Sequence, residues 1–171
     1  MRHRLALAVA TVGLLLAACS PAATPTTTHP PSVVPSSPAP SIPPPSAGGG
    51  TEIGCDAGGH DAAYHIHSLV VVRQNGQVLA PPANIGISTT CMYWVHTHTA
   101  DGIVHVEAPA TVHPTLGDFL TIWEATYPDD QLLVAARGAV GAGEVTVDDQ
   151  PYDGNALDLA FVDQMRIVLG S

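Results

Sequence analysis

Residues 64–82 read YHIHSLVVVRQNGQVLAPP, and no other part of the sequence signals its structure so clearly. β-Branched and other apolar residues lie on both sides of Asn75-Gly76, two residue types that readily adopt the positive φ angles of a type I′ turn. This stretch therefore predicts a β-hairpin. Pro81 and Pro82 end it, because proline has no backbone N–H to donate to a sheet.

A second hairpin is predicted further along the chain. Residues 92–99 and 103–108 have strand character and flank a turn at Asp101-Gly102, and residues 85–87 form a short extended piece before them. Strand patterns return at residues 144–147, 157–159 and 164–169.

Helical character is predicted once. Thr115 can cap a helix, with Asp118 three residues later as its capping-box partner, and Pro128 ends the segment. Apolar residues recur at helical spacing between them, at Leu116, Phe119, Leu120 and Trp123. The elements together predict an α+β fold, a mostly antiparallel β-sheet or open barrel with one amphipathic helix packed on it.

Five histidines are concentrated in the predicted hairpins, namely His65, His67, His96, His98 and His105. Side chains alternate between the two faces of a strand, so the two members of each His-x-His pair point to the same side. Their Cβ atoms are then about 6.5 to 7 Å apart, which lets two imidazoles converge on one ion.

The register of the second hairpin decides whether these pairs meet. A two-residue turn pairs His98 with His105, whereas a four-residue loop pairs His96 with His105; a loop of odd length would move His105 away. Either even register places His96, His98, His105 and Glu107 on one face. The opposite, more apolar face then holds Tyr93, Val95, Thr97, Val104 and Val106.

This pattern suits a divalent transition metal. Three or four imidazoles with a nearby carboxylate, for which Glu107 is the candidate, match tetrahedral Zn²⁺ or a more planar Cu²⁺ site. The alternative is that the histidines are half-buried and hydrogen-bonded to neighbours on a wet sheet face. His60 and His113 lie outside the pattern, and we interpret them as structural or solvated.

The N-terminus predicts a bacterial lipoprotein. A basic start, an apolar run at residues 5–16 and the sequence LAAC at residues 16–19 match a signal peptide with a lipobox. Residues 1–18 are the predicted signal peptide and Cys19 the lipid-modified residue that anchors the chain to a membrane outside the cytoplasm. Residues 19–50 are rich in Pro, Ser and Thr without any charge, which predicts a disordered linker, and residues 51–171 form a single domain.

The remaining cysteines and the charge narrow the choice of partners. In an oxidising compartment Cys55 and Cys91 are expected to form a disulfide, although either thiolate could instead bind a metal. All 15 acidic residues lie from Glu52 onward, against three arginines, so the domain carries a formal charge near −12. Such a surface attracts cations and repels phosphate, so nucleic acid is not expected as a partner.

No motif identifies a catalytic reaction. The sequence contains no HExxH, no GxSxG and no glycine-rich phosphate loop, and the histidines do not follow the cupin pattern. Glu107 or Asp101 could serve as a general base if the metal had an open coordination position. The sequence therefore favours a binding protein over an enzyme.

Four segments resemble a family of small, uncharacterised secreted or membrane-anchored bacterial and archaeal proteins. The segments are HIH at 65–67, CMYWVHTH at 91–98, GIVHVE at 102–107 and TLGDFLTIW at 115–123. The resemblance covers residues 60–171 and implies a shared fold and site, but no activity. This chain has Thr99 where the family pattern has Asp after HTH, and Asp101 follows two residues later.

The sequence leaves three functions to compare. The first is a membrane-anchored lipoprotein that binds copper or zinc for capture, buffering or delivery. The second is a protein-interaction module with structural histidines, and the third is a metal-dependent enzyme.

Overall fold

The computed structural model describes residues 53–57 and 62–171, all within the second of two units of the chain, Ser37–Ser171. The predicted signal peptide, Cys19, the linker and His60 lie outside the described residues, so they stay predictions. Within the described part, no helix combines the length and the apolar character needed to cross a membrane.

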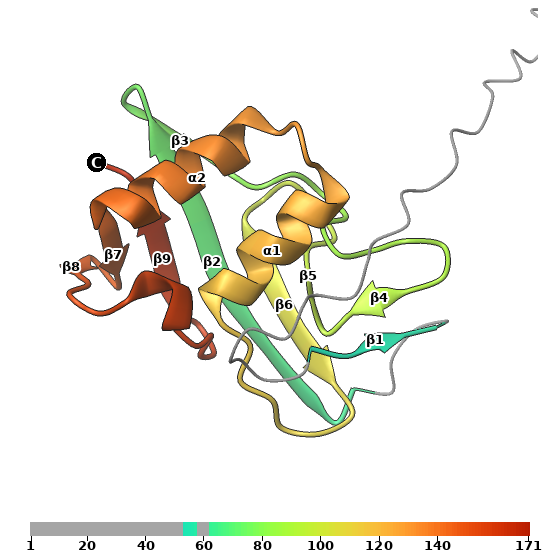
Figure 1. Ribbon diagram of the computed structural model, residues 1–171. Coiled ribbons are helices and arrows are strands. Elements are labelled where there is room, and N and C mark those ends of the chain that lie inside the picture. The colour runs from blue at the N-terminus through green and yellow to red at the C-terminus, as the bar shows by residue number, and fades with distance from the viewer. Residues whose placement is uncertain (1–52, 58–61) are drawn as a thin grey trace, which may run out of the picture. The chain divides into compact units, whose positions relative to one another are not determined.

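A mixed sheet of seven strands forms the centre of the described structure, and β2 (Tyr64–Gln74) is its longest strand (Figure 1). The order of the strands is β5-β6-β2-β9-β7-β8, with β3 paired to the far end of β2. The other strands are β3 (Gln77–Leu79), β5 (Val95–His96), β6 (Ile103–Ala108), β7 (Val145–Val147), β8 (Gln150–Pro151) and β9 (Arg166–Leu169). The pairings are antiparallel except for β2 with β9. The α+β class is thus confirmed, as an open sheet.

The first hairpin is confirmed in its predicted register. Gln74 pairs with Gln77, and the two residues between them, Asn75 and Gly76, have φ angles of 53° and 75°. Both angles are positive, as a type I′ turn requires.

The second hairpin adopts the register of the four-residue loop, with His96 opposite His105. The predicted strand at 92–99 is divided in two. β5 joins the central sheet, while β4 (Met92–Tyr93) pairs with β1 (Cys55–Asp56) in a separate two-stranded sheet. A disulfide joins Cys55 to Cys91, which confirms that prediction and removes both thiolates from the set of metal ligands.

The prediction of a single helix is wrong. α1 (Leu116–Thr126) has the predicted capping box between Thr115 and Asp118, but a second helix, α2 (Gln131–Ala142), follows it. Two glycines, Gly138 and Gly141, lower the helix propensity of α2. Its buried residues are Leu133, Ala136 and Ala139, so small side chains produced little of the periodic apolar signal that identifies helices.

Two shorter segments also differ from the prediction. Residues 157–159 were predicted as a strand, but Ala156–Asp158 form a 3-10 helix capped by the Asn155 side chain. Residues 85–87 lie in a turn in which Gly86 has a φ of 75°, and only Ile87 makes a β-bridge. A polar side-chain cap therefore sets the conformation of the first segment, and a positive φ angle sets that of the second.

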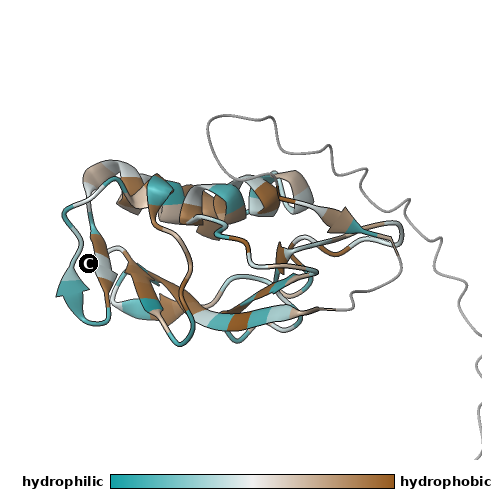
Figure 2. Cartoon of the chain, turned by 90° about the horizontal axis from the view of Figure 1, so that it is seen from below, coloured by the Kyte–Doolittle hydropathy of each residue, from teal (hydrophilic) through white to brown (hydrophobic). Residues whose placement is uncertain are grey.

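Both helices lie on the same side of the sheet (Figure 2). The sheet contributes Ile66 and Val70 from β2 and Val104 and Val106 from β6 to the core, which also contains Phe119 and Trp123 of α1. The predicted apolar face of the second hairpin is therefore the core face. Residues between these positions point to the other side.

Two glycines should respond oppositely to alanine. At Gly102, where φ is 87°, an added Cβ would lie 2.7 Å from the Val70 carbonyl oxygen, so Gly102→Ala should lower the free energy of unfolding by about 2 kcal/mol or more. At Gly138, on the exposed side of α2, a Cβ meets nothing within 4 Å, so Gly138→Ala should raise it by about 0.5–1 kcal/mol. Urea unfolding measures both changes, and shifts of the same sign would contradict the local geometry at one of them.

Removing the disulfide should destabilise the fold. The cysteines are 36 residues apart, and loop-closure entropy for this separation corresponds to about 2–4 kcal/mol. A Cys55→Ser/Cys91→Ser variant should lose this amount of unfolding free energy in urea, and dithiothreitol should lower the stability of the parent chain alone. A variant as stable as the parent would show that the bridge does not constrain the fold.

Candidate metal centre

Three neighbouring strands, β5, β6 and β2, bring the predicted ligand residues together. His67 lies opposite His105, His65 opposite Glu107, and His96 opposite His105 on its other side. Their side chains alternate with the core residues Ile66, Val104 and Val106, so they occupy the face of the sheet away from the helices. His98 lies just beyond the end of β5.

The first group of ligand atoms comes from His96, His98, His105 and Glu107, whose donor atoms lie within 4.8 Å of one another. The Nε2 atoms of His96 and His98 are 3.1 Å apart, and His105 Nδ1 is 3.3 Å from Glu107 Oε1. The Nε2 atoms of His96 and His98 are 3.9 and 4.0 Å from the nearer Glu107 oxygens. A tetrahedral zinc site with Zn–N bonds near 2.0–2.1 Å has edges of about 3.3 Å, so small adjustments would close these atoms around an ion.

The second group comes from His65, His67 and His105, whose donor atoms again lie within 4.8 Å of one another. The ring centroids of His65 and His67 are 4.5 Å apart, and that of His67 is 4.6 Å from that of His105. His65 Nε2 also lies 3.0 Å from Glu107 Oε1, which brings the carboxylate next to this group as well.

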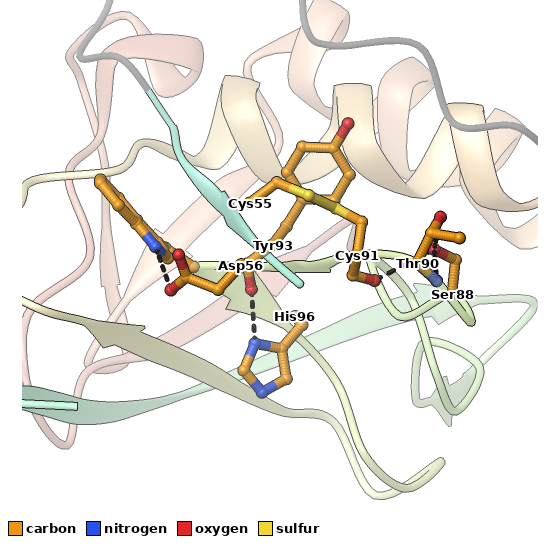
Figure 3. The surroundings of a disulfide bond; sticks show 8 residues. Cys55, Asp56, Ser88, Thr90, Cys91, Tyr93 and His96 are labelled. Carbon is orange, nitrogen blue, oxygen red and sulfur yellow. Dashed lines mark hydrogen bonds between the residues drawn. A yellow bond between two sulfur atoms is a disulfide. The ribbon is translucent and has the colours of Figure 1, made fainter. Parts of the chain in front are cut away.

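His96 is fully buried and held in one orientation (Figure 3). Its Nδ1 lies 2.7 Å from the Tyr93 carbonyl oxygen, which can only accept a hydrogen bond, so Nδ1 donates. The Nε2 lone pair is then directed to the side where His98 and Glu107 lie. A histidine ligand whose second nitrogen donates to a backbone carbonyl is typical of metal sites.

Burial keeps the inner imidazoles neutral. Desolvation lowers the pKa of His96 from 6.5 to about 4, and it also lowers the pKa of His105, with smaller contributions from His98 and His67. Since only a neutral imidazole has a lone pair for a metal, the inner ligands are ready to bind at neutral pH.

Exposure increases from the inside of the cluster to its edge. The His96 side chain is 0% exposed, Glu107 and His105 are 15% and 18% exposed, and His65 and His98 are 44% and 45% exposed. An ion can therefore reach the cluster from solvent past the outer histidines.

Asp101, the other candidate carboxylate, lies outside both groups. The Asp101 carboxylate accepts a hydrogen bond from the Ile103 backbone N–H, which lowers its pKa, and it belongs to neither group. Glu107 is the carboxylate of the first group of donor atoms. The orienting carbonyl of Tyr93 was not anticipated, and no sequence signal marks it, since every residue has a carbonyl.

No protein-family model, no curated protein and no solved structure matches this sequence. The likeness in four motifs described above therefore stays a prediction. Among the described residues, the histidine and carboxylate groups of the cluster could hold a metal ion.

Without metal, the protein should lose stability in mild acid. The folded state holds His96 neutral with a pKa of about 4, whereas its ordinary pKa is 6.5, so the unfolded chain binds the extra proton as the pH falls below 6.5. The free energy of unfolding should fall by about 2 kcal/mol between pH 7.5 and pH 5, and His105 acts in the same direction.

Urea unfolding in EDTA at both pH values measures this loss. A His113→Ala variant, which lacks an exposed histidine outside the cluster, should show the same loss. An unchanged free energy of unfolding between the two pH values would contradict the burial of a neutral His96.

Proposed function

We propose that this protein is a membrane-anchored extracytoplasmic lipoprotein that binds a divalent transition metal, copper or zinc, for capture, buffering or delivery. The primary ligands are His96, His98, His105 and Glu107, with His65 and His67 beside them. One observation carries the metal-binding part of the proposal, namely that the Nε2 atoms of His96 and His98 lie 3.1 Å apart while the Tyr93 carbonyl fixes the His96 ring.

The donor set selects the class of metal. Imidazole nitrogens with one carboxylate suit Zn²⁺ and Cu²⁺, while Cu⁺ prefers thiolate and thioether ligands. The disulfide occupies Cys55 and Cys91, so no thiolate of these residues competes. The acidic composition also attracts divalent cations.

Binding is favoured over catalysis by the number of ligands. The first group supplies four protein ligands, which fill a tetrahedral coordination sphere, whereas catalytic zinc sites keep one position for water. Storage or delivery needs no vacant position. An anchor on Cys19 would hold such a site where extracytoplasmic metal is encountered.

A second function, a protein-interaction module, is favoured by one observation. His65 and His105 both lie within 3.3 Å of Glu107, so the histidines have a polar partner without any ion. In that case the cluster would be a structural network, and added metal would not change the melting temperature.

Metal titration separates these functions. The full chain, purified in mild detergent without a polyhistidine tag, should bind Zn²⁺ or Cu²⁺ with a Kd below about 10 μM at pH 7.5. At 100 times Kd, binding should add about 2.7 kcal/mol to the free energy of unfolding and raise the melting temperature accordingly.

Two exposed histidines provide matched variants for this titration. His98→Ala removes a ligand from the exposed edge and should weaken binding at least tenfold, whereas His113→Ala should leave Kd unchanged. Binding weaker than 10 μM for both metals, or equal Kd values for the two variants, would contradict the proposed site.

A further inference from the structure

The geometry points to a centre for two ions, in which the His105 ring lies between the ions and ligates both. The first ion takes His96, His98, His105 and Glu107, and the second takes His65, His67 and His105. This inference rests on the proposed function, and it adds a second site, the count of ions and the residue that joins them.

His105 lies midway between the two His-x-His pairs. Its ring centroid is 4.6 Å from that of His98 and 4.6 Å from that of His67. The distances to the other member of each pair are also similar, 5.5 Å to His96 and 5.8 Å to His65. Since β6 lies between β5 and β2, the strand order places His105 within reach of an ion held by either pair.

The cluster also has more donors than one tetrahedral ion uses. Five imidazoles and one carboxylate converge, and their donor atoms fall into two sets of four and three with His105 in both. His65 and His67 are two residues apart on β2. Because side chains alternate between the two faces of a strand, both lie on the face away from the helices.

An imidazole can join two ions because its two nitrogens lie on different sides of the ring. His105 Nδ1 is buried and has no well-directed hydrogen bond among the described residues, although Glu107 Oε1 is 3.3 Å away. When both nitrogens bind metal, the ring releases its N–H proton to solvent and becomes an imidazolate. This negative charge offsets part of the repulsion between two dications.

The Glu107 carboxylate lies near both sets of ligands. Its Oε1 lies 3.0 Å from His65 Nε2, next to the second set, and its Oε2 lies 3.9 Å from His96 Nε2, in the first. One carboxylate therefore adds negative charge beside both ion positions.

The number of ions tests the proposal. The full chain, saturated with Cu²⁺ and desalted, should retain two ions in excess of a His65→Ala/His67→Ala/His98→Ala/His105→Ala variant. A His65→Ala/His67→Ala variant should retain one ion and keep the tighter Kd within about threefold. Elemental analysis and calorimetry give both values, and circular dichroism checks that the variants fold.

The outcomes separate the two proposals. One ion in the parent chain would overturn the two-ion centre and leave the proposed function intact. If neither Cu²⁺ nor Zn²⁺ were bound in excess of the quadruple variant, the proposed function itself would be overturned.

Electron paramagnetic resonance tests whether His105 is shared. Two Cu²⁺ ions joined by one imidazolate couple their spins, so the integrated signal should rise to one equivalent of Cu²⁺ and fall as the second binds. The His65→Ala/His67→Ala variant should show only the rise. A signal that grows in proportion to both bound ions would overturn the bridging role of His105.

Discussion

The register of β2 against β6 sets both faces of the sheet at once. With His67 opposite His105, the intervening Ile66 and Val106 point to the helices and join the core. A slip of one residue would expose the apolar side chains and bury the histidines. Apolar burial on one face therefore fixes the register that assembles the imidazoles on the other, because the strand repeats every two residues.

Local signals in the sequence predicted a large part of this arrangement. Asn75-Gly76 determined the first turn through positive φ angles, and Thr115 with Asp118 capped α1 as expected. Either even loop length of the second hairpin places His96 and His105 on one face, and the observed register is the four-residue one. In each case a few neighbouring residues carry the physical cause.

Other features depend on partners distant in sequence and had no local signal. The parallel pairing of β2 with β9 joins segments almost a hundred residues apart. The helix α2 packs through Leu133 and two alanines, and its glycines have low helix propensity, so the sequence did not indicate a helix there. The burial of His96 and its bond to the Tyr93 carbonyl depend on the placement of β4 and β5 in different sheets.

The disulfide constrains the strand that carries the carbonyl group facing His96. Cys55 pairs with Tyr93 across β1 and β4, and its bridge to Cys91 ties these short strands together beside the carbonyl that orients His96. In the reduced chain, β1 would still be held to this corner by its two-residue pairing, by the Trp94 N–H that donates to the Gly54 carbonyl, and by the Trp94 indole that donates to Asp56. Because the bridge constrains the strand that carries the Tyr93 carbonyl, its reduction would loosen the contact that orients His96, so the redox state of two cysteines bears on the geometry of the histidine cluster.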